Sequence, residues 1–186
     1  GGSLYYNSGS GNCYAEQNNA TKACDFTSTG IKDKTRGLIS EETYSLLGWN
    51  TSIVYANEIY EYERSAGEVY SGRPTEWTGK IAIAYPSDYG YAADLGKCTK
   101  QLGSYNDTTC TSNNWMKTII APNYGWLLTT HSDYAYDAWV VLSSGSVGGG
   151  IYAYYSSGVA PVLYLDSELA VKAGTGSSSA PYQLSA

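Results

Sequence analysis

Phenylalanine and methionine are almost absent from this chain of 186 residues, which has one of each beside 20 tyrosines and five tryptophans. A buried tyrosine contributes a large apolar ring, but its hydroxyl still needs a hydrogen-bond partner. We therefore expect an aromatic core with polar edges. A chain of this length buries roughly 70% of its unfolded surface, so we interpret it as one domain that does not depend on cross-links to fold.

Positive charge is also scarce, which argues against nucleic-acid partners. The chain has 11 lysines and arginines against 17 acidic residues, for a net charge of −6, and its densest basic run is KDKTR at 32–36. A phosphate-binding surface needs clustered basic side chains. No apolar run reaches the 18 residues of a membrane span, and no signal peptide opens the chain. We expect no direct membrane contact, and we infer that a secretion signal or anchor has been removed.

The cysteines are few and fall into two pairs, Cys13 with Cys24 and Cys98 with Cys110. Neither pair has the close spacing of a zinc site, and one histidine cannot complete a Cys/His set. Two short-loop disulfides are the simplest interpretation, and they imply an extracellular, oxidising location. The alternative is four free, buried thiols.

Candidate catalytic and metal-ligating groups are scattered. His131, Ser132 and Asp133 are neighbours in sequence, whereas a catalytic triad converges from separate elements, and no G-x-S-x-G turn is present. A calcium site needs several oxygen ligands at close spacing, and the aspartates do not cluster in that way. We therefore expect no enzymatic activity, no cofactor and no metal.

Hydrophobic patterning predicts an α+β fold, with two helices packed on a small antiparallel sheet with long loops. The helices are expected over 35–50, with Ser40 as N-cap and Gly48 as its end, and over 52–64. A turn is expected at 85–93, a polar loop at 94–114 and a short helix at 113–120. The predicted strands span 80–85, 125–130, 138–142, 146–155 and 160–165, followed by one more in the tail.

The domain is expected to span 13–186, after a flexible linker or cloning remnant at 1–12 that is rich in glycine and serine. Within it, the 27 residues of 132–158 include five tyrosines, six serines and five glycines, but no lysine or arginine. Tyr, Ser and Gly are typical of binding surfaces. Strand alternation would place Tyr152, Tyr154 and Ser156 on one face and Ile151, Ala153 and Tyr155 on the other.

Four segments of the second half carry a family resemblance: GWLLTT at 125–130, AWVVLSSGSV at 138–147, GVAPVLYL at 158–165 and GTGSSSAPYQL at 174–184. They resemble the C-type-lectin-fold domains related to formylglycine-generating enzymes, as used by the variable proteins of diversity-generating retroelements. Ala160 stands where that family usually has arginine, so the ion pair of that arginine is not expected here. The oxidation chemistry of the enzymes needs a cysteine pair in the C-terminal core, and this chain has none there.

Earlier segments resemble surface proteins of gut Firmicutes whose N-terminus is similar to a type IV prepilin. These segments are ISEETYSLLG at 39–48, YEYER at 60–64, WTGKIAIAYPSDYGYA at 77–92 and NNWM at 113–116. The prepilin helix itself is not in the chain. The alternative function is therefore the globular head of a type IV pilin-like subunit, with a structural or adhesive role among pilus subunits.

The retroelement resemblance implies a function for 132–158. Such systems randomise template adenines, so that asparagine codons yield Tyr, Ser, Asp and Gly. We expect a surface-displayed protein whose diversified face binds a protein or glycan on another cell or phage. The expected contact residues are Asp133, Tyr134, Tyr136, Asp137, Ser143, Ser144, Gly148, Tyr152, Tyr154 and Ser156. The expected scaffold residues are Trp126, Trp139, Val141, Val159, Pro161, Leu163 and Leu165.

Overall fold

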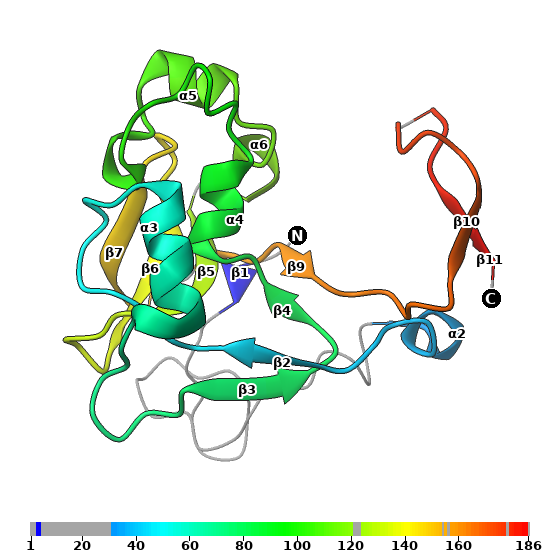
Figure 1. The fold of residues 1–186 in the computed structure, drawn as a ribbon, viewed down its shortest axis with the longest axis horizontal. Coiled ribbons are helices and arrows are strands. Elements are labelled where there is room, and N and C mark those ends of the chain that lie inside the picture. Colours follow the sequence, from blue (N-terminus) through cyan, green and yellow to red (C-terminus); the bar gives the residue numbers. More distant parts are fainter. Residues whose placement is uncertain are drawn as a thin grey trace.

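The structure is a computed structural model that describes residues 3–4, 31–120, 124–153, 155, 157–177 and 179–185. It has a mixed α+β architecture with several small sheets (Figure 1). Cys13, Cys24, Tyr154, Ser156 and nearly all of the 1–12 linker lie outside the described residues. The pairing of Cys13 with Cys24 therefore stays a prediction.

The described helices are short. α3 (Ala56–Glu61) continues into a π-helical turn, η1 (Tyr62–Ala66), and this is the one helical run longer than six residues in the described chain. The other helical elements are α2 (Asp33–Arg36), α4 (Pro86–Tyr91), the 3-10 turn η2 (Leu102–Ser104), α5 (Thr108–Ser112) and α6 (Lys117–Ile120).

Within the described residues the main sheet has five strands in the order β1-β8-β5-β6-β7. They are β1 (Ser3–Leu4), β8 (Ser157–Gly158), β5 (Gly125–Thr130), β6 (Asp137–Val141) and β7 (Val147–Tyr152). The predicted antiparallel meander is confirmed for β5, β6 and β7. β8 instead lies parallel to β5 on the other side, so the meander does not continue past β7.

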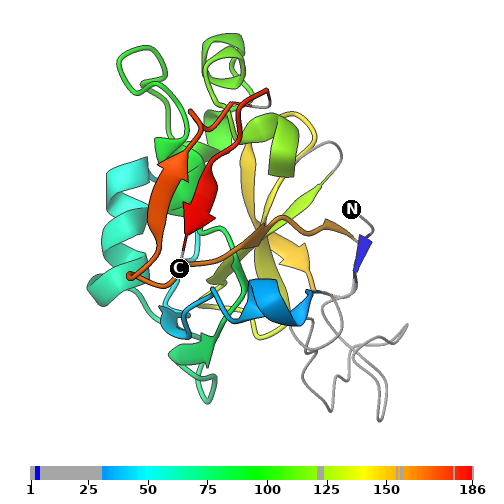
Figure 2. The same cartoon turned by 90° about the vertical axis from the view of Figure 1, so that its right-hand side faces the viewer.

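Three two-stranded ladders complete the described fold. They pair β2 (Glu42–Ser45) with β3 (Glu76–Gly79), β4 (Ala82–Ile83) with β9 (Pro161–Val162), and β10 (Ala170–Ala173) with β11 (Gln183–Ser185). The last hairpin projects from the body of the molecule and carries the C-terminal end (Figures 1 and 2).

The core lies on both faces of β6. Trp139 and Val141 face a large cluster that includes Ile59 of α3 and Tyr89 of α4. Ala138 and Val140 point the other way, against Trp126. Trp126, Trp139 and Val141 are all buried, which confirms them as scaffold.

Two glycines allow the close packing around this core. A Cβ added to Gly149 of β7 would lie 3.3 Å from the Trp139 ring. A Cβ on Gly90 of α4 would lie 2.7 Å from the Ala56 Cβ of α3, closer than two carbon atoms normally approach. Gly149 of β7 and Gly90 of α4 are therefore packing positions, at which the missing side chain lets a neighbour approach.

The helix predicted over 35–50 is wrong. Only Thr35 and Arg36 of that range are helical, as the end of α2 (Asp33–Arg36), and Glu42–Ser45 forms β2. The backbone around β2 forms hydrogen bonds with segments far away in the sequence. The Ser40 amide donates to the Tyr164 carbonyl at 3.0 Å, and the Leu46 amide donates to the Thr75 carbonyl at 2.7 Å. Gly48 does not end a helix but pairs with Glu68. These long-range pairings outweigh a local helical pattern that rests on weak propensities.

The turn predicted at 85–93 is also wrong, because α4 occupies it. Pro86 stands at the first helical position, where proline is favoured. Asp88 is the third residue of the helix, and its carboxylate accepts the Tyr85 amide at 2.9 Å in a capping box. The same arrangement occurs at α3, where Glu58 accepts the Tyr55 amide at 2.7 Å. The two packed helices of this fold are therefore α3 and α4.

The last predicted strands are shorter than expected. The strand expected at 146–155 ends at Tyr152, and of 160–165 only Pro161–Val162 is a strand. Pro161, Leu163 and Leu165 were expected to be scaffold, but they are exposed. The chain beyond β9 leaves the sheet toward the β10–β11 hairpin (Figure 1), and Leu163 and Leu165 in this segment are exposed.

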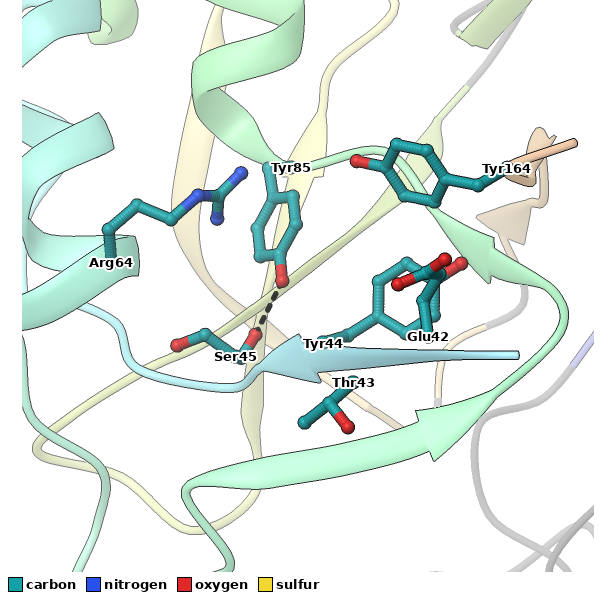
Figure 3. A pocket seen from close by; sticks show the side chains of 7 residues that line it. All are labelled: Glu42, Thr43, Tyr44, Ser45, Arg64, Tyr85 and Tyr164. Carbon is teal, nitrogen blue, oxygen red and sulfur yellow. Dashed lines mark hydrogen bonds between the residues drawn. The ribbon is translucent and has the colours of Figure 1, made fainter. Parts of the chain in front are cut away.

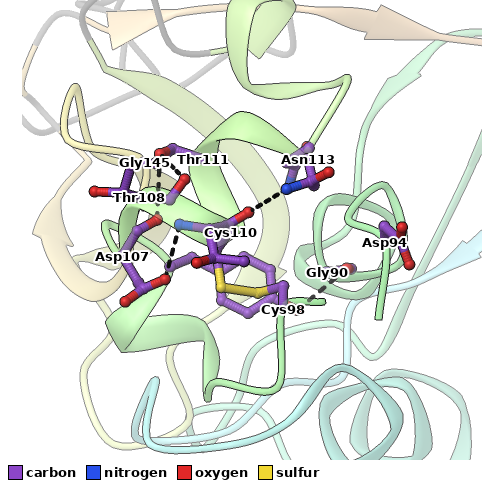
Figure 4. Close-up of a disulfide and its surroundings, with 12 residues drawn as sticks. Gly90, Asp94, Cys98, Asp107, Thr108, Cys110, Thr111, Asn113 and Gly145 are labelled. Atoms are coloured by element: carbon purple, nitrogen blue, oxygen red, sulfur yellow. Dashed lines mark hydrogen bonds between the residues drawn. A yellow bond between two sulfur atoms is a disulfide. The ribbon is translucent and has the colours of Figure 1, made fainter. Parts of the chain in front are cut away.

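The 94–114 segment is closed by the predicted disulfide between Cys98 and Cys110, both of which are buried (Figure 4). Asp107 caps α5 by accepting the Thr109 amide at 2.9 Å. Among the described residues, no helix is both long enough and apolar enough to cross a membrane. A disulfide is typical of oxidising compartments.

A buried carboxylate links the helices to the sheet. Glu63 of η1 is fully buried, and one of its oxygens accepts the Ser87 amide at 3.0 Å and the Thr129 hydroxyl at 3.4 Å. The other oxygen accepts the Ser87 hydroxyl. Burial raises the pKa of Glu63 from 4.5 to about 7, although the Ser87 hydrogen bonds and Arg64 oppose the shift.

We predict that removing the disulfide destabilises the domain. The bridge joins residues 12 apart, and a loop of that size is worth roughly 2–3 kcal/mol in the chain-entropy account. The double variant Cys98→Ala/Cys110→Ala should lose that much free energy of unfolding in a denaturant titration. Free thiols at these positions in non-reducing peptide mapping of the native protein would contradict the assignment.

We predict that Glu63 makes stability fall as pH rises. Its pKa is higher when folded than the 4.5 of the free group, so its contribution is fully present below pH 4.5 and is lost as pH rises to about 7. The loss is roughly 3 kcal/mol, from 1.36 kcal/mol per unit. The free energy of unfolding of Glu63→Gln relative to the parent should therefore rise by that amount between these limits. A constant difference across the range would show that Glu63 titrates normally.

Candidate functional site

Four exposed tyrosines gather at one end of the strands β5, β6 and β7. Tyr134 and Tyr136 lie in the β5–β6 loop, Tyr152 ends β7, and Tyr155 follows it. We call these four residues the tyrosine face. Their rings form a continuous series, with centroids 5.8 Å apart for Tyr134 and Tyr136, 5.5 Å for Tyr136 and Tyr152, and 6.0 Å for Tyr152 and Tyr155.

Backbone hydrogen bonds hold the loop to the sheet and so position these rings. The Ala153 amide donates to the Tyr136 carbonyl at 2.8 Å, and the Tyr155 amide donates to the Tyr152 carbonyl at 2.9 Å. Asp137 pairs with Tyr152 across the β6–β7 ladder. Tyrosine has few rotatable bonds, so rings on a fixed backbone offer contact area at little entropic cost.

The exposed fractions of these side chains are close to one half, with 50% for Tyr136 and 51% for Tyr155. Further along β7 from Tyr152, Gly149 lies against the ring of Trp139, which is fully buried in β6. The tyrosine face is thus exposed to solvent and lies next to the buried core. We therefore expect that truncating its rings does not expose the core.

Neighbouring segments add to the tyrosine face. The His131 ring lies 5.1 Å from the Tyr134 ring. Arg73 donates to the Ala135 carbonyl at 3.2 Å, which ties the loop before β3 to the loop before β6. Burial raises the pKa of Tyr136, and the nearby charges of Asp137 and other tyrosines, including Tyr70, raise it further.

Two aspartates accompany the tyrosines. Asp133 is exposed, and its amide donates to His131 Nδ1 at 3.1 Å. Asp137 is half-buried, and burial raises the pKa of its carboxyl, which His131 opposes. Within the described chain the Asp137 Oδ1 atom is buried and has no hydrogen-bond partner. This end of the sheet is therefore aromatic, with two aspartates beside the rings and Arg73 against the same loop.

The predicted contact residues do not form one surface. Asp133, Tyr134, Tyr136, Asp137 and Tyr152 come together at the tyrosine face. The exposed Ser143 and Ser144 lie in the turn between β6 and β7, at the opposite end of these strands, and Gly148 pairs with Val140 within the ladder.

The serine turn is held by structural contacts. Gly145 has a φ of 99°, which favours glycine, and its carbonyl accepts the buried Tyr89 hydroxyl at 2.7 Å. A Cβ there would lie 2.8 Å from Thr111 of α5. The turn is thus docked against the segment that the disulfide closes (Figure 4).

Sequence reasoning missed Tyr155. Alternation placed it opposite Tyr152, whereas in the structure the two rings stack with an interplanar angle of 21°. The strand ends at Tyr152, so the period of two does not extend to Tyr155. A preceding run of three glycines was the available signal that the strand would not continue regularly.

The three neighbours His131, Ser132 and Asp133 do not have triad geometry. The Ser132 hydroxyl donates to the Asp133 carboxylate at 3.2 Å, and His131 Nδ1 accepts a backbone amide. In a triad the serine donates to the histidine, and the carboxylate accepts from the other ring nitrogen.

Comparison with protein-family models, with curated proteins and with solved structures finds no match for this chain.

We predict that chelation leaves the protein unchanged. In the part of the chain that the structure describes, no three His, Cys, Asp or Glu side chains lie together as metal ligands. A bound metal would stabilise the folded state by mass action. The melting temperature in excess EDTA should therefore equal that in buffer, and a fall of more than a few degrees would reveal a metal site.

Proposed function

We propose that this chain is an extracellular, surface-displayed binding domain that recognises a protein or glycan through the tyrosine face. The observation that carries the proposal is the unbroken series of four half-exposed tyrosine rings at the ends of β6 and β7. Exposed aromatic clusters on rigid supports are typical of recognition surfaces.

The charge around the tyrosine face defines the partner further. Asp133 and Asp137 lie beside the rings, residues 132–158 contain no lysine or arginine, and the basic residue Arg73 reaches this loop from another segment. Electrostatic complementarity accelerates association with an oppositely charged surface. The ligand patch is therefore expected to be neutral or basic, with apolar area for the tyrosine rings.

The proposal includes a C-type-lectin-type domain whose 132–158 region is diversified by a retroelement. Its support is the resemblance of the segments around β5, β6 and β9, together with the division between buried strand residues and exposed Tyr, Asp and Ser. Sequencing the native locus tests this part. A reverse-transcriptase gene and an imperfect repeat of the 132–158 coding region are expected beside the gene, and their absence would remove the diversification claim.

The binding role predicts that substitutions separate binding from stability. After a ligand is selected from arrays of bacterial surface proteins and glycans, Tyr136→Ala and Tyr152→Ala should weaken binding by about 2 kcal/mol or more, as anchor residues do. Their free energy of unfolding should fall by about 1 kcal/mol or less, since only ring contacts at the surface are lost.

Trp139→Ala is the matched control, because its side chain is fully buried. It should cost about 3–5 kcal/mol of stability and affect binding only through unfolding. Binding isotherms and melting curves for each variant give the comparison. Tyrosine variants that unfold as readily as Trp139→Ala would refute the proposal, and variants that impair only filament assembly would favour a pilin-type packing role.

A further inference from the structure

A second concave site lies away from the tyrosine face, beside β2. It is a pocket of about 210 Å³ lined by Glu42, Tyr44, Ser45, Arg64, Tyr85 and Tyr164. These residues come from β2, η1, the start of α4 and the segment after β9 (Figure 3). We call it the β2 pocket. It shares no residue with the tyrosine face, so its function is a separate question.

Three tyrosine rings form the walls of the β2 pocket. Tyr44 is buried and lies between Trp77 and Tyr164, with ring centroids 5.6 and 6.1 Å away. Tyr85 is also buried, and its hydroxyl donates to the Ser45 carbonyl at 2.8 Å, which holds the ring in place. The exposed Tyr164 ring completes the wall on the opposite side (Figure 3).

Opposite charges stand at the two ends of the pocket. The Arg64 guanidinium lies over the Tyr85 ring, 4.2 Å from its centroid, and has no ion pair among the described residues. Glu42 lies at the Tyr164 end (Figure 3), where one of its oxygens accepts the Ser40 hydroxyl at 2.8 Å. The pocket therefore offers hydrogen-bond donors at one end and acceptors at the other, with no net charge.

One polar atom of the pocket has no partner. The Tyr44 hydroxyl is buried without a hydrogen bond in the described part of the chain, and burial raises its pKa, as do Tyr164 and Glu42. Buried hydroxyls nearly always have a partner in folded proteins. Glu42 lines the same pocket, and its charge acts on the Tyr44 hydroxyl, so a ligand hydrogen-bonded to this carboxylate lies close enough to supply the missing partner.

We propose that the β2 pocket binds one neutral pyranose unit of a glycan. A sugar hydroxyl both donates and accepts hydrogen bonds, so a single ring can donate to Glu42 and accept from Arg64. The C–H face of a pyranose packs on the electron-rich face of an aromatic ring. The volume is below the roughly 300–1,000 Å³ of sites for drug-sized ligands, which suits one ring rather than an oligosaccharide.

Titration of the ¹⁵N-labelled protein with the methyl glycosides of glucose, galactose, mannose and N-acetylglucosamine tests the proposal. At least one glycoside should shift the amide signals of 42–45, 64, 85 and 164 at millimolar concentration. Glu42→Gln and Tyr164→Ala should each weaken that affinity about tenfold, because the first replaces a charge-assisted hydrogen bond by a weaker neutral one and the second removes a stacking ring.

Tyr44→Phe is the sharper variant, because it deletes only the unpartnered hydroxyl. The melting temperature should stay equal or rise, whereas glycoside affinity should fall about fivefold, the value of one ordinary hydrogen bond. Tyr124→Phe, at an exposed tyrosine outside the pocket, serves as the matched control and should change neither quantity.

Three results would overturn the proposal. The first is the absence of amide shifts with all four glycosides, and the second is unchanged glycoside affinity in Glu42→Gln and Tyr44→Phe. The third is tighter binding of glycine or glutamate than of any glycoside at the same amides, because a zwitterion also matches the charges of Arg64 and Glu42. If Tyr164→Ala does not fold, the affinity of the folded Tyr44→Phe variant still decides the test. Failure here leaves the tyrosine face untouched.

Discussion

Burial of β6 on both faces is the constraint on which the rest of the fold depends. Trp139 and Val141 need cover on one side, and Ala138 and Val140 need it on the other. The helices α3 and α4 cover the first side, and on the second side Trp126 of the neighbouring strand β5 packs beside these residues together with partly buried side chains. Protein interiors are packed to crystal-like density, so close neighbours hold β6 on both faces.

The position of the tyrosine face follows from this packing. The packing of β6 holds the backbone at the ends of β6 and β7, so side chains attached there face solvent from a defined position. Tyr136 and Tyr152 occupy one such end. At the other end, the serine turn is tied to the disulfide segment through the Tyr89–Gly145 hydrogen bond. The structure therefore leaves one end open to solvent and uses the other for internal packing.

The second layer of organisation is polar. Glu63 bridges η1, α4 and β5 with one carboxylate, and the next residue, Arg64, extends outward over Tyr85. The π-helical turn brings both residues to this junction. π-Helical turns are frequent at functional sites. The buried junction and the β2 pocket thus have a common origin in η1, because the residue that anchors the helix is adjacent to the one that lines the pocket.

Local sequence determined the features whose physics is local. Apolar runs and cysteine spacing predicted the strands β5 and β6, the helix expected over 52–64, and the disulfide between Cys98 and Cys110. They also predicted the burial of Trp126 and Trp139. The enrichment of Tyr, Ser and Gly in 132–158 likewise indicated a surface. Tertiary structure alone decided which of those residues meet, since Tyr155 joins Tyr152 only because the strand ends there. It also made β2 from a segment with a helical pattern, because the partners at Thr75, Trp77 and Tyr164 lie far away in sequence, and it is these partners that create the β2 pocket.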